Sequence, residues 1–155
     1  MNSHASESIA YAEIVVEAAQ QRAFETFVNL SAWWPLDSHH IGEGDAVAAV
    51  FETRSGGRIY ERAADGTECD WGRVLECEPP DRLLYDWQLT SEWKYDPTFH
   101  TDVEVRFIAL APKRTRVELR HQVSAYGDKA ADMRSVFLQP GGWPGLLESF
   151  AKTVE

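Results

Sequence analysis

Hydrophobic and polar positions follow two different periods along this chain. Across residues 47–124 they alternate at every second residue, as in half-buried β-strands, and turn-forming residues separate the runs. Ser55-Gly56-Gly57 and Asp65-Gly66 are typical of tight hairpin turns, so the strands are predicted to form an antiparallel meander. The predicted strands of this meander span residues 47–53, 58–62, 68–78, 82–89, 101–110 and 115–124, and a separate strand is predicted over residues 9–17.

Helical spacing replaces the alternation in the remaining segments. Residues 20–30 are predicted to form a helix because Ala23, Phe24, Phe27 and Val28 recur at helical spacing. Short helical turns are predicted over residues 31–36 and 132–138. From residue 143 onward, spacings of three and four predict a long C-terminal helix with one apolar face, formed by Trp143, Leu146, Leu147, Phe150, Ala151 and Val154.

This order of elements predicts an α+β fold. A meander has one face that must be covered, and the long C-terminal helix is the largest element available to cover it. We therefore expect a curved antiparallel β-sheet wrapped around that helix, with the first helix closing one end. We find no linker that would divide the chain, so residues 9–155 are predicted to form a single domain and residues 1–8 a disordered tail.

Strand alternation predicts which side chains face the helix. In residues 68–78 the phase is ambiguous, because apolar residues occur at both parities; we favour an inward set that leaves Arg73 as an inward charge. The predicted inward residues are Cys69, Trp71, Leu75 and Cys77; Leu83, Tyr85, Trp87 and Leu89; Val103, Val105, Phe107 and Ala109; and Val117, Leu119, His121 and Val123.

The inward face is rich in aromatic residues that carry a polar atom. Two interpretations stay open: a filled core, or the wall of a cavity between the sheet and the helix. His121 is either a satisfied core histidine, a ligand-facing hydrogen-bonding group, or an acid or base. The candidate ligand-binding residues are Trp71, Arg73, Tyr85, Trp87, Phe107, His121, Trp143 and Phe150.

Two loops hold more aromatic residues than solvated loops need. Residues 91–100 include Trp93, Tyr95 and Phe99, and the earlier segment includes Trp33 and Trp34. Exposed apolar clusters usually cover or bind something. These aromatic residues are therefore interpreted either as a lid over the cavity mouth or as part of a homodimer interface.

Composition narrows the possible partners and the compartment. The chain has 155 residues and a formal net charge of −10, with no cluster of Lys or Arg that could bind nucleic acid. No apolar run approaches the roughly 20 residues that span a bilayer, and the N-terminal residues do not resemble a signal peptide. The predicted location is cytoplasmic, with no nucleic-acid or membrane partner. Cys69 and Cys77 lie on one predicted strand, too far apart to pair.

The sequence contains none of the common nucleotide-binding or hydrolase motifs. His39 and His40 are adjacent and chelate poorly as a pair, so a metal site with His100 and Asp102 is the weaker interpretation of these residues. We predict no metal, no cofactor and no catalytic residue.

Six segments, in order, carry a resemblance to a known superfamily. They are residues 13–16, Trp33-Trp34-Pro35, 51–57, 71–83, 101–107 and 142–148. Together they resemble the SRPBCC (START/birch-pollen-allergen-like) superfamily, and within it the bacterial homologues of the activator of heat-shock-protein-90 ATPase (C-terminal-domain type). The resemblance covers residues 9–155 and implies a helix-grip fold with a hydrophobic cavity. It departs from the commoner pattern at residues 91–100 and 137–140.

Three functions compete. The leading hypothesis is the binding of a small hydrophobic or aromatic ligand between the sheet and the C-terminal helix. The second is a co-chaperone-like module that stimulates a partner ATPase through its acidic surface and the Trp33-Trp34 region. The third is a cofactor-free cyclase, dehydratase or hydrolase that uses His121 or Tyr85. The sequence favours a binding protein over an enzyme.

Overall fold

A computed structural model describes residues 8–155 of the chain. The prediction of a disordered tail over residues 1–8 lies outside the described residues, except for Ser8, whose carbonyl accepts a hydrogen bond from Val123 N. The strands are β1 (Ile9–Val16), β2 (Ala46–Phe51), β3 (Arg58–Ala63), β4 (Glu68–Glu78), β5 (Arg82–Trp87), β6 (Thr101–Ala111) and β7 (Arg114–Gln122). The helices are α2 (Gln20–Val28), α3 (Ala130–Phe137) and α4 (Trp143–Val154), with 3-10 turns η1 (Leu30–Ala32) and η2 (Ser124–Lys129).

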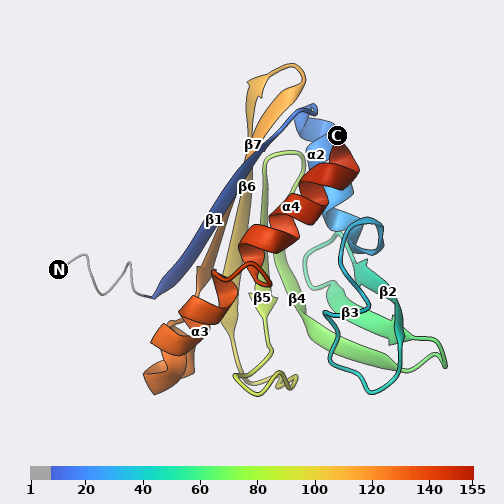
Figure 1. Cartoon of the computed structure of the whole chain (residues 1–155), viewed down its shortest axis with the longest axis vertical. Coiled ribbons are helices and arrows are strands. Elements are labelled where there is room, and N and C mark those ends of the chain that lie inside the picture. Colours follow the sequence, from blue (N-terminus) through green and yellow to red (C-terminus); the bar gives the residue numbers. More distant parts are fainter. Residues whose placement is uncertain (1–7) are drawn as a thin grey trace.

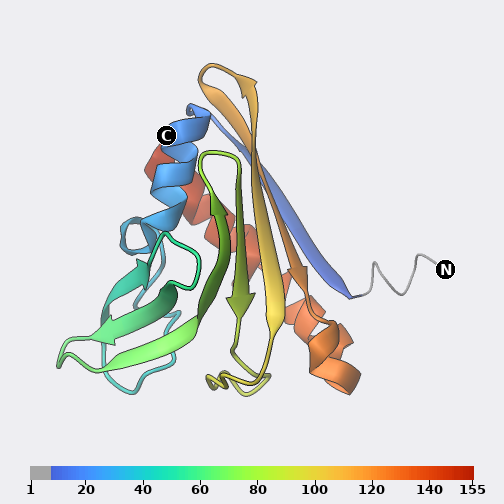
Figure 2. The same ribbon diagram turned by 180° about the vertical axis from the view of Figure 1, so that it is seen from behind.

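All seven strands form one antiparallel sheet in the order β1-β7-β6-β5-β4-β3-β2. The meander from β2 to β7 follows the prediction, and β1 pairs with β7 to complete the sheet. Helix α4 crosses the concave face of the curved sheet, whereas no helix within residues 8–155 covers the opposite face (Figures 1 and 2). The predicted helix-grip architecture is therefore confirmed.

Aromatic packing joins α2, α4 and the sheet at one end of the molecule. The Phe27 ring lies 5.6 Å from Phe107 on β6 and 5.5 Å from Phe150 on α4, in edge-to-face geometry. Trp33, just after η1, closes this cluster at 5.6 Å from Phe150. Edge-to-face pairs are stabilising beyond their buried area, so this cluster fixes α4 against the sheet.

Two β-bulges in β4 correct the predicted inward phase of that strand. Against β3 the register skips Trp71, and against β5 it skips Leu75. Each extra residue reverses the alternation. Trp71 and Val74 are therefore both buried, while Arg73 and Leu75 are exposed, contrary to prediction.

The β6–β7 hairpin extends beyond the helices (Figure 1). Ala109, predicted to face inward, is exposed because it lies near the tip, where no helix covers it. The inward residues closer to the middle of β6, Val103, Val105 and Phe107, are buried as predicted.

Candidate functional site

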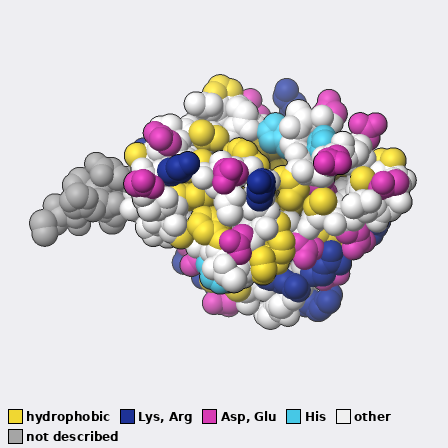
Figure 3. Space-filling view, turned by 90° about the horizontal axis from the view of Figure 1, so that it is seen from below, with side chains coloured by type: hydrophobic (Ala, Val, Ile, Leu, Met, Phe, Trp, Pro, Cys, Tyr) yellow, Lys and Arg dark blue, Asp and Glu magenta, His cyan; other side chains and the backbone are white. Residues whose placement is uncertain are grey.

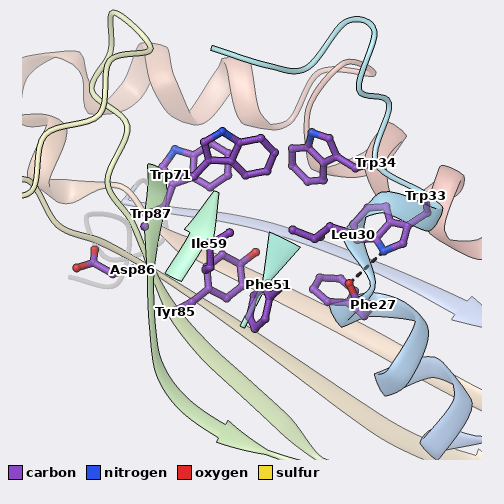
Figure 4. A pocket seen from close by; sticks show the side chains of 11 residues that line it. Phe27, Leu30, Trp33, Trp34, Phe51, Ile59, Trp71, Tyr85, Asp86 and Trp87 are labelled. Carbon is purple, nitrogen blue, oxygen red and sulfur yellow. Dashed lines mark hydrogen bonds between the residues drawn. The ribbon is translucent and has the colours of Figure 1, made fainter. Parts of the chain in front are cut away.

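The space under α4 is divided into two unequal parts. At the α2 end, side chains fill the interior and leave a void of about 10 Å³. Figure 4 shows the rings of Phe27, Phe51 and Tyr85 around this void, with Trp34, Trp71 and Trp87 on its other side. A void of this size holds at most one water molecule, so no organic ligand fits there.

The second part is a cavity of about 480 Å³, within the range of roughly 300–1,000 Å³ typical of small-molecule sites. It lies between the loop after η1, the loop after β5, and the connection from α3 to α4. Five of the six tryptophans contribute to its wall: Trp34, Trp71, Trp87, Trp93 and Trp143. The other lining residues are Ser38, His39, His40, Ile41, Leu89, Val136, Phe137, Gln139, Gly141, Gly142 and Leu146.

Three of these tryptophans separate the cavity from the packed end. Trp34, Trp71 and Trp87 line both spaces. Trp34 and Trp71 lie with ring centroids 5.0 Å apart, and Trp87 contacts Trp143 at 5.4 Å. The wall of the cavity is thus a set of aromatic rings that are supported by one another.

The predicted site residues fall into three groups. Trp71, Trp87 and Trp143 line the cavity. Tyr85, Phe107, Phe150 and His121 are buried but do not line it, because they belong to the packed core. Arg73 is not a cavity residue, because the bulges of β4 place it on the exposed side of the strand.

His121 is the satisfied core histidine among the three interpretations of this residue. Trp143 Nε1–H donates to His121 Nδ1 at 3.2 Å, and His121 Nε2–H donates to Thr101 Oγ1 at 2.9 Å. Thr101 Oγ1–H donates in turn to the Trp87 carbonyl at 2.7 Å. Burial lowers the pKa of His121 to about 3, so the ring is neutral at pH 7. Its role is to fix Trp143 and Trp87 in the cavity wall.

Glu61 on β3 holds the segment from residue 38 to residue 42, here called the 38–42 loop. Its side chain is buried and accepts hydrogen bonds from Ile41 N at 2.6 Å, Gly42 N at 3.0 Å and Trp71 Nε1 at 2.8 Å. A carboxylate satisfied by three N–H donors is well suited to this buried position. Glu61 therefore connects the 38–42 loop to one of the wall tryptophans.

The two histidines of this loop have different hydrogen bonds. His39 Nε2 donates to the Gly141 carbonyl at 2.8 Å, and its Nδ1 accepts from Ser38 Oγ at 2.7 Å. His39 thereby links the loop to the α3–α4 connection across the cavity. His40 Nδ1 donates to the Gly42 carbonyl at 3.0 Å, and within the described residues its Nε2 has no hydrogen-bond partner.

Trp93 lies at the mouth of the cavity in a strained backbone conformation. Its φ is +61°, in the left-handed region, and its side chain is 43% exposed. The Trp93 N–H donates to Thr90 O at 2.9 Å, and a bridge between Leu89 and Tyr95 closes the turn. The ring contacts Phe137 at 6.0 Å. Strained backbone conformations in non-glycine residues cluster at functional sites, so Trp93 is a candidate site residue.

The two aromatic segments differ in exposure, since Trp93 is exposed at the cavity whereas Trp33 and Trp34 are buried. Trp33 and Trp34 are buried, so they do not form the exposed contact surface that the co-chaperone hypothesis assigned to them. Phe99 packs on Tyr126 at 4.9 Å, and Trp93 borders the cavity.

Sequence reasoning missed the polar part of the cavity wall. Ser38, His39, His40 and Gln139 come from two loops whose approach depends on the path of the whole chain. The adjacent histidines were a usable signal, but the sequence gives no sign of their contacts with Glu61 and Gly141. Hydrophobic side chains and histidines appear together on the face seen from below (Figure 3).

Within the described part of the chain, no group of three His, Cys, Asp or Glu side chains is arranged to hold a metal ion. No helix in residues 8–155 is both long and apolar enough to cross a membrane.

Comparisons with known proteins agree with this fold. Residues 19–155 match the family described as activator of Hsp90 ATPase homolog 1-like protein. The chain is 34% identical to the solved structure of an anthrahydroquinone-γ-pyrone synthase, Txn09, with a TM-score of 0.65 and coverage of 94% of this chain and 96% of that one. No curated protein sequence matches the chain.

Two further solved structures are similar over nearly the whole length. CalC from Micromonospora echinospora, described as a self-sacrificing resistance protein, is 27% identical, with a TM-score of 0.70 and coverage of 96% of this chain and 94% of that one. Protein NE0264 from Nitrosomonas europaea is 12% identical, with a TM-score of 0.69 and coverage of 96% and 95%, and shows the shared fold alone.

Proposed function

The chain belongs to the activator of Hsp90 ATPase homolog 1-like family, and from this membership and its cavity we propose that it binds a planar, polycyclic aromatic small molecule. Proteins with this SRPBCC fold bind hydrophobic ligands or act as cyclases. The observation that carries the proposal is the cavity of about 480 Å³ whose wall includes five tryptophans. Rings of this kind stack on flat aromatic ligands.

The proportion of apolar and polar side chains in the cavity wall indicates the class of ligand. Apolar rings make up most of it, and the polar side chains of Ser38, His39, His40 and Gln139 are its smaller part. A small-molecule site typically has this composition, with a few polar groups that set orientation. A fused aromatic system with oxygen substituents at one edge satisfies both parts. The 34% identity to a synthase of an anthrahydroquinone-γ-pyrone supports the same class.

The proposal is tested by titration with 2-methylanthraquinone, a flat tricyclic aromatic probe. We expect quenching of tryptophan fluorescence, because five of the six tryptophans border the cavity, and a raised melting temperature, because the ligand binds the folded state. No quenching and no thermal shift up to the solubility limit, with this probe and with 2-hydroxyanthraquinone, would count against the proposal.

A second candidate function is a cofactor-free cyclase, favoured by the identity to that synthase. The residues first considered for it are poorly placed. His121 uses both ring nitrogens, and burial raises the pKa of the Tyr85 hydroxyl, which keeps it protonated. A cyclase would therefore depend on other side chains, at the polar part of the cavity.

A further inference from the structure

His39 and His40 are the titratable side chains among the described residues that line the cavity. They differ in one respect that matters for proton transfer. A carbonyl oxygen only accepts hydrogen bonds, so the proton of His39 is on Nε2, which donates to Gly141 O, and its Nδ1 lone pair accepts from Ser38. His39 has no lone pair left for a ligand.

His40 keeps one lone pair free. Its Nδ1 carries the proton, because it donates to the Gly42 carbonyl at 3.0 Å, so Nε2 is the unprotonated nitrogen of the neutral ring. No described residue donates to Nε2. The hydrogen bond to Gly42 holds the side chain in the loop. The side chain is also 23% exposed, so it stays accessible.

A buried carboxylate lies next to the His40 ring. The buried Glu61 places Oε2 at 4.0 Å from His40 Nδ1, and Glu61 is itself fixed by three N–H donors. Cys69, the nearest thiol to this loop, does not compete as a base, because burial raises its pKa above the ordinary value. The Gly42 carbonyl orients Nδ1 of His40, and Nε2 keeps the lone pair that a general base needs.

We infer that His40 accepts a proton from the bound ligand, and that this ligand carries an acidic hydroxyl group, a phenol or an enol, on its aromatic framework. The inference rests on the proposed function and names the substrate class of the same cavity. The O–H bond of the ligand breaks and an N–H bond forms at His40 Nε2. The oxygen keeps the electron pair as a phenolate or enolate, and the imidazolium next to Glu61 balances its charge. Glu61 is a positioning residue in this step.

The test compares two probes that differ in one group. 2-Hydroxyanthraquinone carries a phenol whose absorption band moves to longer wavelength on ionisation, and 2-methylanthraquinone has the same rings without it. Titrations are carried out at about pH 7, where an imidazole with the ordinary pKa of about 6.5 is mostly neutral and able to accept a proton, and each spectrum is compared with that of the free probe at the same pH. For the wild-type protein we expect a long-wavelength shift of the bound hydroxy probe and roughly tenfold tighter binding than for the methyl probe.

Two variants of neighbouring histidines separate the roles. His40→Gln is expected to lose the spectral shift and the roughly tenfold preference while it still binds the methyl probe. His39→Gln is the matched control: it removes the link to Gly141 and can change the affinity for both probes, but it keeps the shift and the preference. Melting temperatures of both variants check that they are folded.

The outcomes distinguish the inference from the proposed function. If His40→Gln keeps the shift, or if the wild-type protein binds both probes equally and without a shift, His40 is not the proton acceptor, although the cavity still binds aromatic ligands. If the wild-type protein binds neither probe, the proposed function and the inference both fall.

Discussion

At the scale of single residues, the buried polar side chains of this protein organise the cavity. His121 orients Trp143, and Glu61 orients Trp71 and the 38–42 loop. Each is satisfied by direct hydrogen bonds, and for such groups the loss of one partner is costly because the other stays buried. The position of the ring wall thus depends on a few hydrogen bonds beneath it.

His121 predicts a specific dependence of stability on pH. Its pKa is about 3 in the folded protein and about 6.5 when unfolded, so the unfolded chain binds the extra proton between these values. The neutral, buried His121 therefore contributes fully to the free energy of unfolding above pH 6.5. This contribution is lost as the pH falls toward 3, by about 1.4 kcal/mol per pH unit. Between pH 7 and pH 5 the loss from this residue is about 2 kcal/mol.

Urea unfolding of the wild-type protein and of His121→Gln at both pH values measures this contribution. We expect the variant to be less stable than the wild type at pH 7. From pH 7 to pH 5, however, its free energy of unfolding should decrease by about 2 kcal/mol less than that of the wild type. His100, whose pKa is raised by its hydrogen bond to Asp86, is present in both proteins and cancels in the difference. Equal pH dependence in the two proteins would contradict the neutral, buried state of His121.

The backbone of Trp93 leads to a second prediction at this scale. A φ of +61° strains any residue that has a Cβ atom, by about 1–2 kcal/mol, and glycine adopts it freely. We expect Trp93→Gly to be about 1 kcal/mol more stable than Trp93→Ala in urea unfolding, the reverse of the usual order. Both variants lack the ring and should bind 2-methylanthraquinone more weakly. Trp93→Ala at least as stable as Trp93→Gly would show that the strain is absent.

At the scale of elements, the connection between α3 and α4 packs closely against the start of α4. A Cβ atom on Gly145, in the first turn of α4, would lie 1.8 Å from the Pro140 carbonyl oxygen. One on Gly142 would lie 2.2 Å from the Phe137 carbonyl oxygen. The connection therefore lies so close to the start of α4 that only glycine fits at positions 142 and 145. This packing also positions the Gly141 carbonyl for its hydrogen bond with His39.

Gly145→Ala tests this packing against helix propensity. In an open helix the change would stabilise by about 1 kcal/mol, because alanine is the better helix former. Here the overlap with backbone should outweigh that gain, and we expect a net destabilisation of about 1–3 kcal/mol in urea unfolding. Gly141→Ala is the matched control, since its Cβ would meet nothing within 4 Å. A stabilised Gly145→Ala variant would mean that the connection is not closely packed.

At the scale of the whole molecule, the alternation of residues such as Val103, Val105 and Phe107 was enough to predict the sheet and the covering helix, because burial on one face imposes that period. The position of the cavity could not be predicted in this way. Trp71 and Leu75 lie at bulges that local alternation does not reveal, and the ring sizes of Phe27, Phe51 and Tyr85 fill one end of the interior. The contacts of His40 depend on Glu61, which is about 20 residues away.

The proposed function requires that a flat aromatic ligand occupies the cavity beside α4. Calorimetric titration of 2-methylanthraquinone into wild-type protein, Leu146→Trp and Leu110→Trp tests it most directly. Leu146 lines the cavity, whereas Leu110 is 45% exposed near the tip of the β6–β7 hairpin, so the same substitution fills the site in one variant and leaves it open in the other. We predict that Leu146→Trp weakens binding at least about tenfold, equivalent to about 1.4 kcal/mol, and that Leu110→Trp binds like the wild type. Equal binding by all three folded proteins would contradict the claim.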